Sequence, residues 1–308
     1  MWSRTNWGLG AVAVSAILAI FALGFAFGVH KHASQQVPPS DSPQVIARLN
    51  DLDAAVRKLS LGQLQPSDVI AATRDSVCFI VSTYSLTAVR AGHLARDPHH
   101  LLGSGFLIAG NLVVSNRHVL EPWFGDPDSE DAIRTGSIPR RERIIAYFPG
   151  YPDGVDLTNV VVSSDADVAI ASVKFPEDMK IQPLSLASRA SSPGDPVVVI
   201  GYPLGVTTMV AKSTAFPFRE LTLRQTQGNV DHIAKVKLIR PSATQGHVVD
   251  VSDQTLMYDA STAHGSSGGP VFNLHGEVIG VNAAFIDGFT GSSLGVSTGL
   301  LEELLANK

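Results

Sequence analysis

The chain has 308 residues, of which 44% are hydrophobic and 17% are charged, and its formal net charge is −5. This composition excludes a disordered or collagen-like chain, and the single cysteine, Cys78, excludes an intrachain disulfide. The acidic balance lacks the basic surplus of a protein that binds nucleic-acid phosphates, so no nucleic-acid partner is expected.

An uncharged apolar stretch covers residues 7–29. A helix of that length spans about 35 Å, which is enough to cross a hydrocarbon core of about 30 Å. We therefore predict a signal-anchor over residues 1–32 that inserts residues 7–29 into the lipid bilayer of an inner membrane. The rest of the chain would then lie in the periplasm or outside the cell. The alternative is a signal peptide cleaved near Gly24 or Ala26, which would make the protein a secreted one.

Residues 33–65 are predicted to be a linker followed by a short amphipathic helix. The spacing of the apolar residues matches the a and d positions of a coiled coil, although only about two heptads are present. One hypothesis is a helix that folds against its own domain. The other is self-association through residues 45–59. The apolar positions are Val45, Leu49, Leu52, Val56 and Leu59.

Beyond Pro66 the sequence changes to short β-branched runs separated by turn residues. The Gly110-Asn111 pair predicts a two-residue hairpin turn, and helical periodicity is limited to residues 68–73 and 300–306. Many short strands over about 240 residues predict an all-β barrel or sandwich in one domain, residues 66–308. The predicted strands are Val77–Ser82, Phe106–Ala109, Leu112–Ser115, Val160–Ser163, Val168–Val173, Val197–Ile200 and Val278–Ala283.

The segment Gly265-Ser-Ser-Gly-Gly-Pro270 contains a candidate nucleophile, Ser267. Its glycine neighbours leave the hydroxyl open to approach and allow a turn that directs two backbone N–H groups at one oxyanion. The segment also matches the Gly-x-Ser-x-Gly elbow of α/β-hydrolases. However, the glycines and Pro270 that follow the serine start a helix poorly, and the acid-then-histidine order of an esterase is missing downstream. The esterase reading is therefore rejected.

Two further residues supply the chemistry that a serine nucleophile needs. His118 follows the predicted strand 112–115, and Asp167 directly precedes the predicted strand 168–173. Taken alone, each is more often structural, as a packed histidine or as a cap at the start of a strand. Together with Ser267 they follow the chain order of a chymotrypsin-type triad.

With these residues in place, the chain resembles the trypsin-like peptidases, most closely the HtrA/Deg branch. The resemblance covers approximately residues 66–300. It rests on five ordered motifs: Gly103-Ser-Gly-Phe106, Ser115-Asn-Arg-His-Val119, Asp167-Val-Ala-Ile170, Gly201-Tyr-Pro-Leu-Gly205, and the nucleophile segment with Gly276–Asn282.

The resemblance implies an all-β fold of two barrels with a cleft between them. Ser267 would be the nucleophile, His118 the general base and then acid, and Asp167 the carboxylate that orients the histidine. Asp165 is the weaker alternative for the acid. Backbone N–H groups of Gly265 and Ser267 would form the oxyanion hole.

The resemblance also places the substrate-binding residues. Ser261 stands where trypsin-type enzymes carry the acid that selects Lys or Arg, so a basic residue before the cleaved bond is not expected. The resemblance favours small or medium aliphatic side chains before the cleaved bond. Thr262 and His264 nearby leave a preference for an acidic side chain as an alternative. The residues implied in substrate binding are Ser261, Thr262, His264, Asn282 and Ala283.

The chain departs from the family pattern at several points. Ser266 replaces the usual asparagine before the nucleophile. The segment between His118 and Asp167 is long, and its acids are interpreted as a solvated loop rather than a calcium loop. No metal is expected, and a chain ending at Lys308 leaves no room for the PDZ module that HtrA proteins usually carry. The acids are Asp126, Asp128, Glu130 and Asp131.

The sequence thus predicts a membrane-anchored serine endopeptidase that cleaves polypeptides outside the cytoplasm through an acyl-enzyme and needs no cofactor. Its expected setting is protein quality control or regulated proteolysis. The alternative hypothesis is a catalytically silent or latent pseudoprotease that acts as a binding or scaffold module.

Overall fold

The computed structural model describes residues 47–48, 64–90, 93–212, 226–285 and 292–306, of which residues 89–90, 93–97, 226–229 and 284–285 are described by their backbone alone. The chain divides into two units, residues 1–61 and 62–308, and only helical residues 47 and 48 are described in the first. The predicted membrane anchor and most of the predicted stalk lie outside the described residues. Within the described ranges, no helix is both long enough and apolar enough to cross a membrane.

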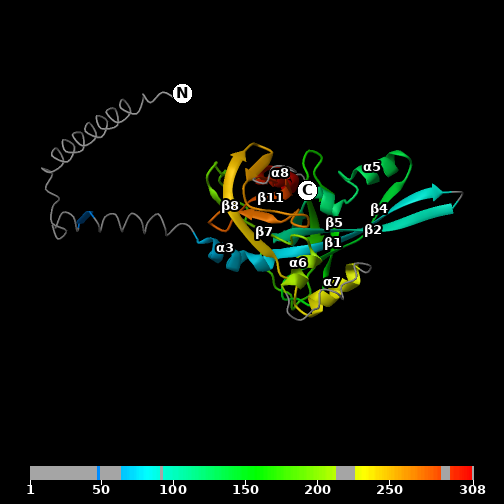
Figure 1. Ribbon diagram of the computed structural model, residues 1–308, viewed down its shortest axis with the longest axis horizontal. Helices are drawn as coiled ribbons and strands as arrows, with labels where there is room; N and C mark the ends of the chain where they lie inside the picture. Colours follow the sequence, from blue (N-terminus) through cyan, green and yellow to red (C-terminus); the bar gives the residue numbers. More distant parts are fainter. Residues whose placement is uncertain (1–46, 49–63, 91–92, 213–225, 286–291, 307–308) are drawn as a thin grey trace, which may run out of the picture. The chain divides into compact units, whose positions relative to one another are not determined.

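The first half of the second unit forms a closed antiparallel barrel of six strands in the order β1-β2-β3-β6-β5-β4 (Figure 1). Alternate residues point inward and pack as a dry core, which includes Ile80, Leu107 and Val113. The strands are β1 Val77–Arg90, β2 His93–Ile108, β3 Leu112–Ser115, β4 Ile138–Tyr147, β5 Val155–Val162 and β6 Ala169–Val173.

The second half forms another closed antiparallel barrel, in the order β10-β11-β12-β9-β8-β7. Its interior is filled by residues such as Val199, Leu256 and Val271. The two barrels confirm the all-β double-barrel fold that the motif resemblance implied. The strands are β7 Pro196–Gly201, β8 Ser242–Val251, β9 Thr255–Tyr258, β10 Pro270–Phe272, β11 Val278–Phe285 and β12 Ser293–Ser297.

Short helices surround the barrels. The two helical segments predicted from periodicity are confirmed as α3 and α8. The described helices are α3 Pro66–Thr73, η1 Arg74–Ser76 (a 3-10 turn), α4 Arg117–Leu120, α5 Pro127–Arg134, α6 Val206–Ala211, α7 Thr226–Lys235 and α8 Thr298–Ala306.

The prediction of a solvated loop in the acidic segment is wrong, because this segment forms α5. Asp126 caps the helix: its Oδ2 accepts a hydrogen bond of 2.9 Å from the backbone N–H of Ser129. Pro127 occupies the first turn, where its missing N–H costs nothing, and Asp128 and Glu130 lie at the positive end of the helix dipole. The acids are therefore start signals for a helix.

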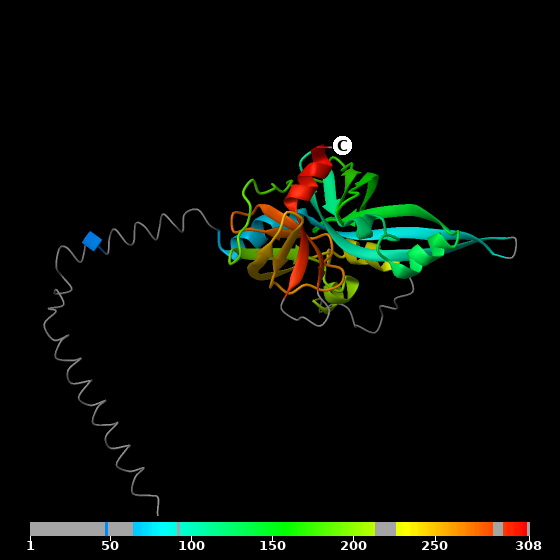
Figure 2. The ribbon, with the colours of Figure 1, turned by 90° about the horizontal axis from the view of Figure 1, so that it is seen from above.

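Strands β1 and β2 form one hairpin that runs well beyond the barrel (Figure 2). The sequence predicted only residues 77–82 and 106–109 of these strands, because the outer part lacks a β-branched run. Aromatic contacts support this part instead: the Tyr84 ring stacks on His99 with centroids 5.1 Å apart and also contacts Trp123. At the base, Gly110 and Asn111 both have positive φ, as the predicted hairpin turn requires.

The two barrels meet at Ser104 of β2, which forms hydrogen bonds to the backbone of the second barrel. The buried Ser104 hydroxyl donates to the carbonyl of Gly265 at 2.7 Å and accepts from the N–H of Tyr202 at 3.0 Å. The Ser104 N–H donates to the carbonyl of Ser267 at 2.8 Å. Gly268 has a φ of +87°, and a Cβ there would lie 2.1 Å from the Ser104 carbonyl oxygen. Only glycine fits this contact.

We expect Ser104→Ala to lower the free energy of unfolding by about 1–3 kcal/mol, because it strands the Tyr202 N–H and the Gly265 carbonyl without partners. Chemical denaturation measures the change. The matched control is Ser188→Ala at an exposed position, which should stay within about 0.5 kcal/mol of wild type. Equal effects of the two substitutions would contradict this role of Ser104.

Candidate active site

His118 lies in α4, the single helical turn that follows β3. Val119 and Leu120 of this turn are fully buried, whereas the His118 side chain is 28% exposed and so remains accessible from the cavity. The guanidinium of Arg117 bonds to the Glu121 carboxylate and to the Ser163 carbonyl, which anchors the turn to the segment between β5 and β6. The local sequence thus fixes the backbone and leaves the imidazole accessible from the cavity.

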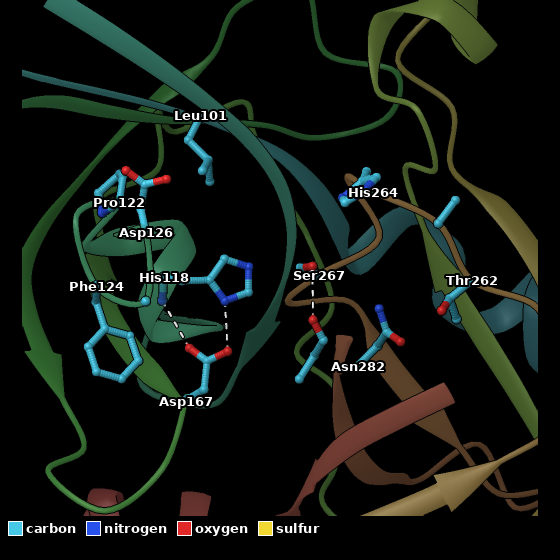
Figure 3. Close-up of a pocket in the computed structure, with 13 residues that line it drawn as sticks. Leu101, His118, Pro122, Phe124, Asp126, Asp167, Thr262, His264, Ser267 and Asn282 are labelled. Atoms are coloured by element: carbon cyan, nitrogen blue, oxygen red, sulfur yellow. Dashed lines mark hydrogen bonds and ion pairs between the residues drawn. The ribbon is translucent and has the colours of Figure 1, made fainter. Parts of the chain in front are cut away.

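The carboxylate of Asp167, just before β6, binds His118 at two points (Figure 3). One oxygen, Oδ2, lies 2.7 Å from Nδ1 of the imidazole, and Oδ1 accepts from the His118 backbone N–H at 2.9 Å. Because an ionised carboxylate only accepts hydrogen bonds, Nδ1 carries a proton here, and in the neutral imidazole Nε2 then keeps its lone pair. This arrangement can hold an imidazole ready to accept a proton.

The structure separates the two candidate acids. Asp165 accepts a hydrogen bond from its neighbour Ser164 at 2.8 Å, whereas Asp167 contacts His118. Asn116 supports Asp167, since its buried side-chain Nδ2 donates to the Asp167 carbonyl at 2.7 Å. The sequence motif contained Asn116 without revealing this role.

Ser267 faces the same cavity from the second barrel (Figure 3). Its hydroxyl donates to the carbonyl of Ala283 on β11 at 3.1 Å. Among the described residues the hydroxyl forms no hydrogen bond with His118, so the expected contact between nucleophile and base is not made. The cavity measures about 500 Å³. Its lining consists of Leu101, His118, Pro122, Phe124, Gly125, Asp126, Asp167, Thr262, Ala263, His264, Ser267, Asn282 and Ala283.

The turn before Ser267 leaves two backbone donors open. The carbonyl of His264 accepts from the N–H of Leu204 at 2.6 Å, and in a trans peptide the next N–H, that of Gly265, points the opposite way. Within the described part of the chain, neither the Gly265 N–H nor the Ser267 N–H has an acceptor. Such a pair of donors can receive a developing negative charge on oxygen.

Two backbone conformations hold this turn in place, and the sequence analysis anticipated the glycine at position 265 but not the conformation of Leu204. Leu204 adopts a φ of +54°, which is rare for a residue with a side chain, and this conformation presents its N–H to His264. Gly265 has a φ of +89°, and a Cβ there would lie 2.6 Å from the Tyr202 carbonyl. The Gly201–Gly205 motif therefore shapes the turn of the nucleophile.

A buried tyrosine orients the predicted substrate-binding residue Asn282. The Tyr258 hydroxyl donates to Oδ1 of Asn282, and burial raises the pKa of Tyr258, so this group stays protonated. The amide Nδ2 of Asn282 is consequently the end left for the cavity. Thr262 is held by the Ser293 hydroxyl at 2.9 Å.

The structure brings four of the five predicted substrate-binding residues to the cavity. Thr262, His264, Asn282 and Ala283 line it. Ser261 is not part of the lining, and its carbonyl accepts from the Thr244 hydroxyl at 2.9 Å.

Comparison with known proteins places this geometry in a family. Residues 103–281 match the model of the trypsin-like peptidase domain. The chain is 28% identical over 208 residues to the mitochondrial serine protease HTRA2 of Bos taurus, covering 66% of this chain and 35% of that protein. It is 23% identical over 260 residues to a glutamyl endopeptidase of Staphylococcus epidermidis, covering 81% of this chain and 77% of that protein. It spans about a third of the length of several HtrA-type relatives.

A solved structure shows the same fold. The active form of the Rv3671c protease from M. tuberculosis superposes with a TM-score of 0.50 at 21% identity, covering 77% of this chain and 82% of that one. Since the family model covers more than half of the chain, the resemblance drawn from the motifs is confirmed, and the protein belongs to the family of trypsin-like serine peptidases, with HtrA-type proteases among its relatives.

Proposed function

We propose that this protein is a serine endopeptidase that cleaves polypeptides through an acyl-enzyme, with Ser267, His118 and Asp167 as its catalytic residues. One observation carries the proposal: the Asp167 carboxylate binds His118 twice at a cavity that Ser267 also lines, and the N–H groups of Gly265 and Ser267 have no acceptor within the described part of the chain. A binding module has no need for this combination.

Each group has a defined part in the proposed reaction. Nε2 of His118 takes the proton from the Ser267 hydroxyl while Oγ attacks the peptide carbonyl carbon, and the carbonyl oxygen gains the negative charge. The N–H groups of Gly265 and Ser267 stabilise that oxyanion. His118 then gives its proton to the leaving amine as the C–N bond breaks. Water, deprotonated by His118, hydrolyses the remaining ester and regenerates Ser267.

The reaction requires the Ser267 hydroxyl to leave the Ala283 carbonyl. Rotation about the Cα–Cβ bond redirects Oγ and frees that carbonyl to accept an N–H from the substrate backbone. The present bond to Ala283 also favours the second candidate function, a latent or catalytically silent peptidase fold that binds polypeptides. The two functions differ in whether substrate binding breaks the hydrogen bond between the Ser267 hydroxyl and the Ala283 carbonyl.

The cellular setting of the proposal rests on the sequence alone. We propose that residues 7–29 anchor the protein in a membrane, with the peptidase domain in the periplasm or outside the cell, and that residues 45–59 self-associate. A role in protein quality control or regulated proteolysis fits an exported peptidase with HtrA-type relatives.

We predict that Ser267→Ala, His118→Ala and Asp167→Asn each lower the hydrolysis of an unfolded protein such as casein by at least about 10³-fold, because each removes one member of a unit that acts together. Release of fluorescent fragments measures the rate. Asp165→Asn is the matched control, and it should stay within about twofold of wild type, since Asp165 does not contact His118. A large loss in the control with none in Asp167→Asn would contradict the assignment.

We also predict that cleavage after Lys or Arg is at least about tenfold slower than cleavage after uncharged residues. On the Ser267 side of the cavity Asn282 presents an N–H donor. Among the described residues that line the cavity, the carboxylates are Asp126 and Asp167, and both belong to the first barrel with His118. A buried cation beside Asn282 would therefore stay unpaired. Profiling of cut sites on a peptide library tests this, and a majority of cuts after Lys or Arg would refute it.

A further inference from the structure

Two polar side chains, Asn282 and Thr262, line the cavity on the same side as Ser267 (Figure 3). Asn282 belongs to β11, and Thr262 lies in the segment that leads from β9 to the nucleophile turn. The backbone of Asn282 is bonded to this turn at two points. Its N–H donates to the Gly269 carbonyl and its carbonyl accepts from the Gly268 N–H, both at 2.8 Å. The side-chain amide of Asn282 therefore starts from a fixed place relative to Ser267.

The hydrogen bond to Tyr258 fixes which end of the Asn282 amide faces the cavity. The Tyr258 hydroxyl is buried and has one hydrogen, and within the described part of the chain its acceptor is Oδ1 of Asn282. The reversed amide would leave that hydrogen unpaired in the core, which is unfavourable. Nδ2 of Asn282 thus faces the cavity, and its N–H groups have no acceptor among the described residues. Asn282 offers the cavity donors only.

Thr262 presents the opposite polarity to the cavity. A hydroxyl has a single hydrogen, and that of the buried Ser293 is donated to the Ala260 carbonyl at 2.9 Å. The 2.9 Å contact between the hydroxyls of Thr262 and Ser293 is then a hydrogen bond that Thr262 donates. Because its hydrogen is used on Ser293, the Thr262 oxygen has only lone pairs left. Thr262 therefore offers the cavity an acceptor.

We propose that this pair of groups selects a carboxamide side chain, that of glutamine or asparagine, at the substrate residue immediately before the cleaved bond. The inference rests on the proposed function, in which the acyl part of the substrate is bonded to Ser267 and its side chain lies on the Ser267 side of the cavity. A carboxamide carries an acceptor and a donor on one carbon atom. Its oxygen would accept from Nδ2 of Asn282, and its N–H would donate to the Thr262 oxygen.

The same two groups disfavour the competing side chains. An ionised carboxylate has no hydrogen to donate, so one of its oxygens would face the lone pairs of Thr262. An aliphatic side chain would exclude water and leave both groups without partners, and a buried ammonium would meet the donors of Asn282. The proposed preference therefore differs from the aliphatic one that the family resemblance implied, and also from its acidic alternative.

The first test measures kcat/KM for peptides that differ only at the residue before the cleaved bond. Gln, Glu and Met form one set of similar shape, and Asn, Asp and Leu form a second. We expect the better of the two carboxamides to exceed both other members of its set by at least about tenfold, because each of them leaves a polar group of the site unpaired.

The second test removes the acceptor at Thr262. Thr262→Val keeps the shape of the side chain, and we expect the preference for the carboxamide over the acid to fall at least about fivefold, since the acid no longer faces lone pairs. Thr262→Ser is the matched control, because it keeps the hydroxyl, and it should keep the preference. The readout is a ratio of two rates in one protein, so a general loss of activity or of folded protein does not alter it.

The third test removes the donor at Asn282. The double variant Asn282→Leu with Tyr258→Phe takes away both partners of the buried hydrogen bond, so no hydroxyl is left unpaired in the core. We expect the preference for the carboxamide over the apolar member of its set to fall at least about fivefold. An unchanged preference in this double variant, or in Thr262→Val, would contradict the assignment of these groups.

The outcomes separate this inference from the proposed function. Cleavage at equal rates within each set, or fastest for the acids or the apolar residues, would overturn the carboxamide site and leave the peptidase function intact. If no peptide is cleaved, the peptidase function fails, and fluorescence anisotropy of labelled peptides that end in each of the six residues decides the site. Tighter binding of a carboxamide peptide than of both other members of its set would support the site, and any other order would reject it.

Discussion

Ser104 and Gly268 bring the backbones of the two barrels so close together that no side chain fits between them. A Cβ on Gly268 would overlap both the Ser104 carbonyl oxygen and the Ser115 hydroxyl. The Ser104 N–H and hydroxyl in turn hold the carbonyls on either side of the nucleophile, those of Gly265 and Ser267. The position of Ser267 relative to the first barrel therefore follows from backbone hydrogen bonds, which are short and directional.

The groups of the candidate site are divided between the two barrels that this contact joins. In the proposed mechanism the first barrel supplies the proton-transfer pair, His118 and Asp167, on two segments that β3 and β6 hold side by side. The second barrel would supply the hydroxyl and the oxyanion donors on one tight turn, to which the Leu204 N–H is hydrogen-bonded. Neither barrel holds all the groups that acyl transfer requires. Chemistry at this cavity is thus a property of the contact between them.

The sequence identified the candidate site residues more readily than the residues that hold them in place. The His118 and Asp167 motifs are local, since each follows or precedes a β-branched run that packs in a core, and the Ser267 motif is marked by its glycines. The strands Val77–Ser82 and Val197–Ile200 were found for the same reason. Residues such as Ser104, Asn116 and Tyr258 escaped notice because their roles come from partners distant in sequence. A serine that joins two barrels has the same local pattern as any strand serine.

The remaining differences have equally physical causes. The outer halves of β1 and β2 lack an apolar core, so no hydrophobic run marked them, and cross-strand pairing and the rings of Tyr84 and Trp123 support them instead. Helix α5 differs from the predicted solvated loop because its acids occupy the N-cap and the first turn of a helix, where they complement the helix dipole. The exposed residues of strands β4 and β8 are largely polar, so neither strand has a long β-branched run from which it could be predicted.

Covalent labelling with a fluorophosphonate, followed by mass spectrometry of the peptides, tests the central claim most directly, because the reagent reacts far faster with a serine that a base and an oxyanion hole activate than with an ordinary hydroxyl. The account predicts one adduct, on Ser267, which is lost in Ser267→Ala and strongly reduced in His118→Ala. A folded wild-type protein that forms no adduct, or forms it at another residue, while a reference serine peptidase is labelled in the same tube, would contradict it.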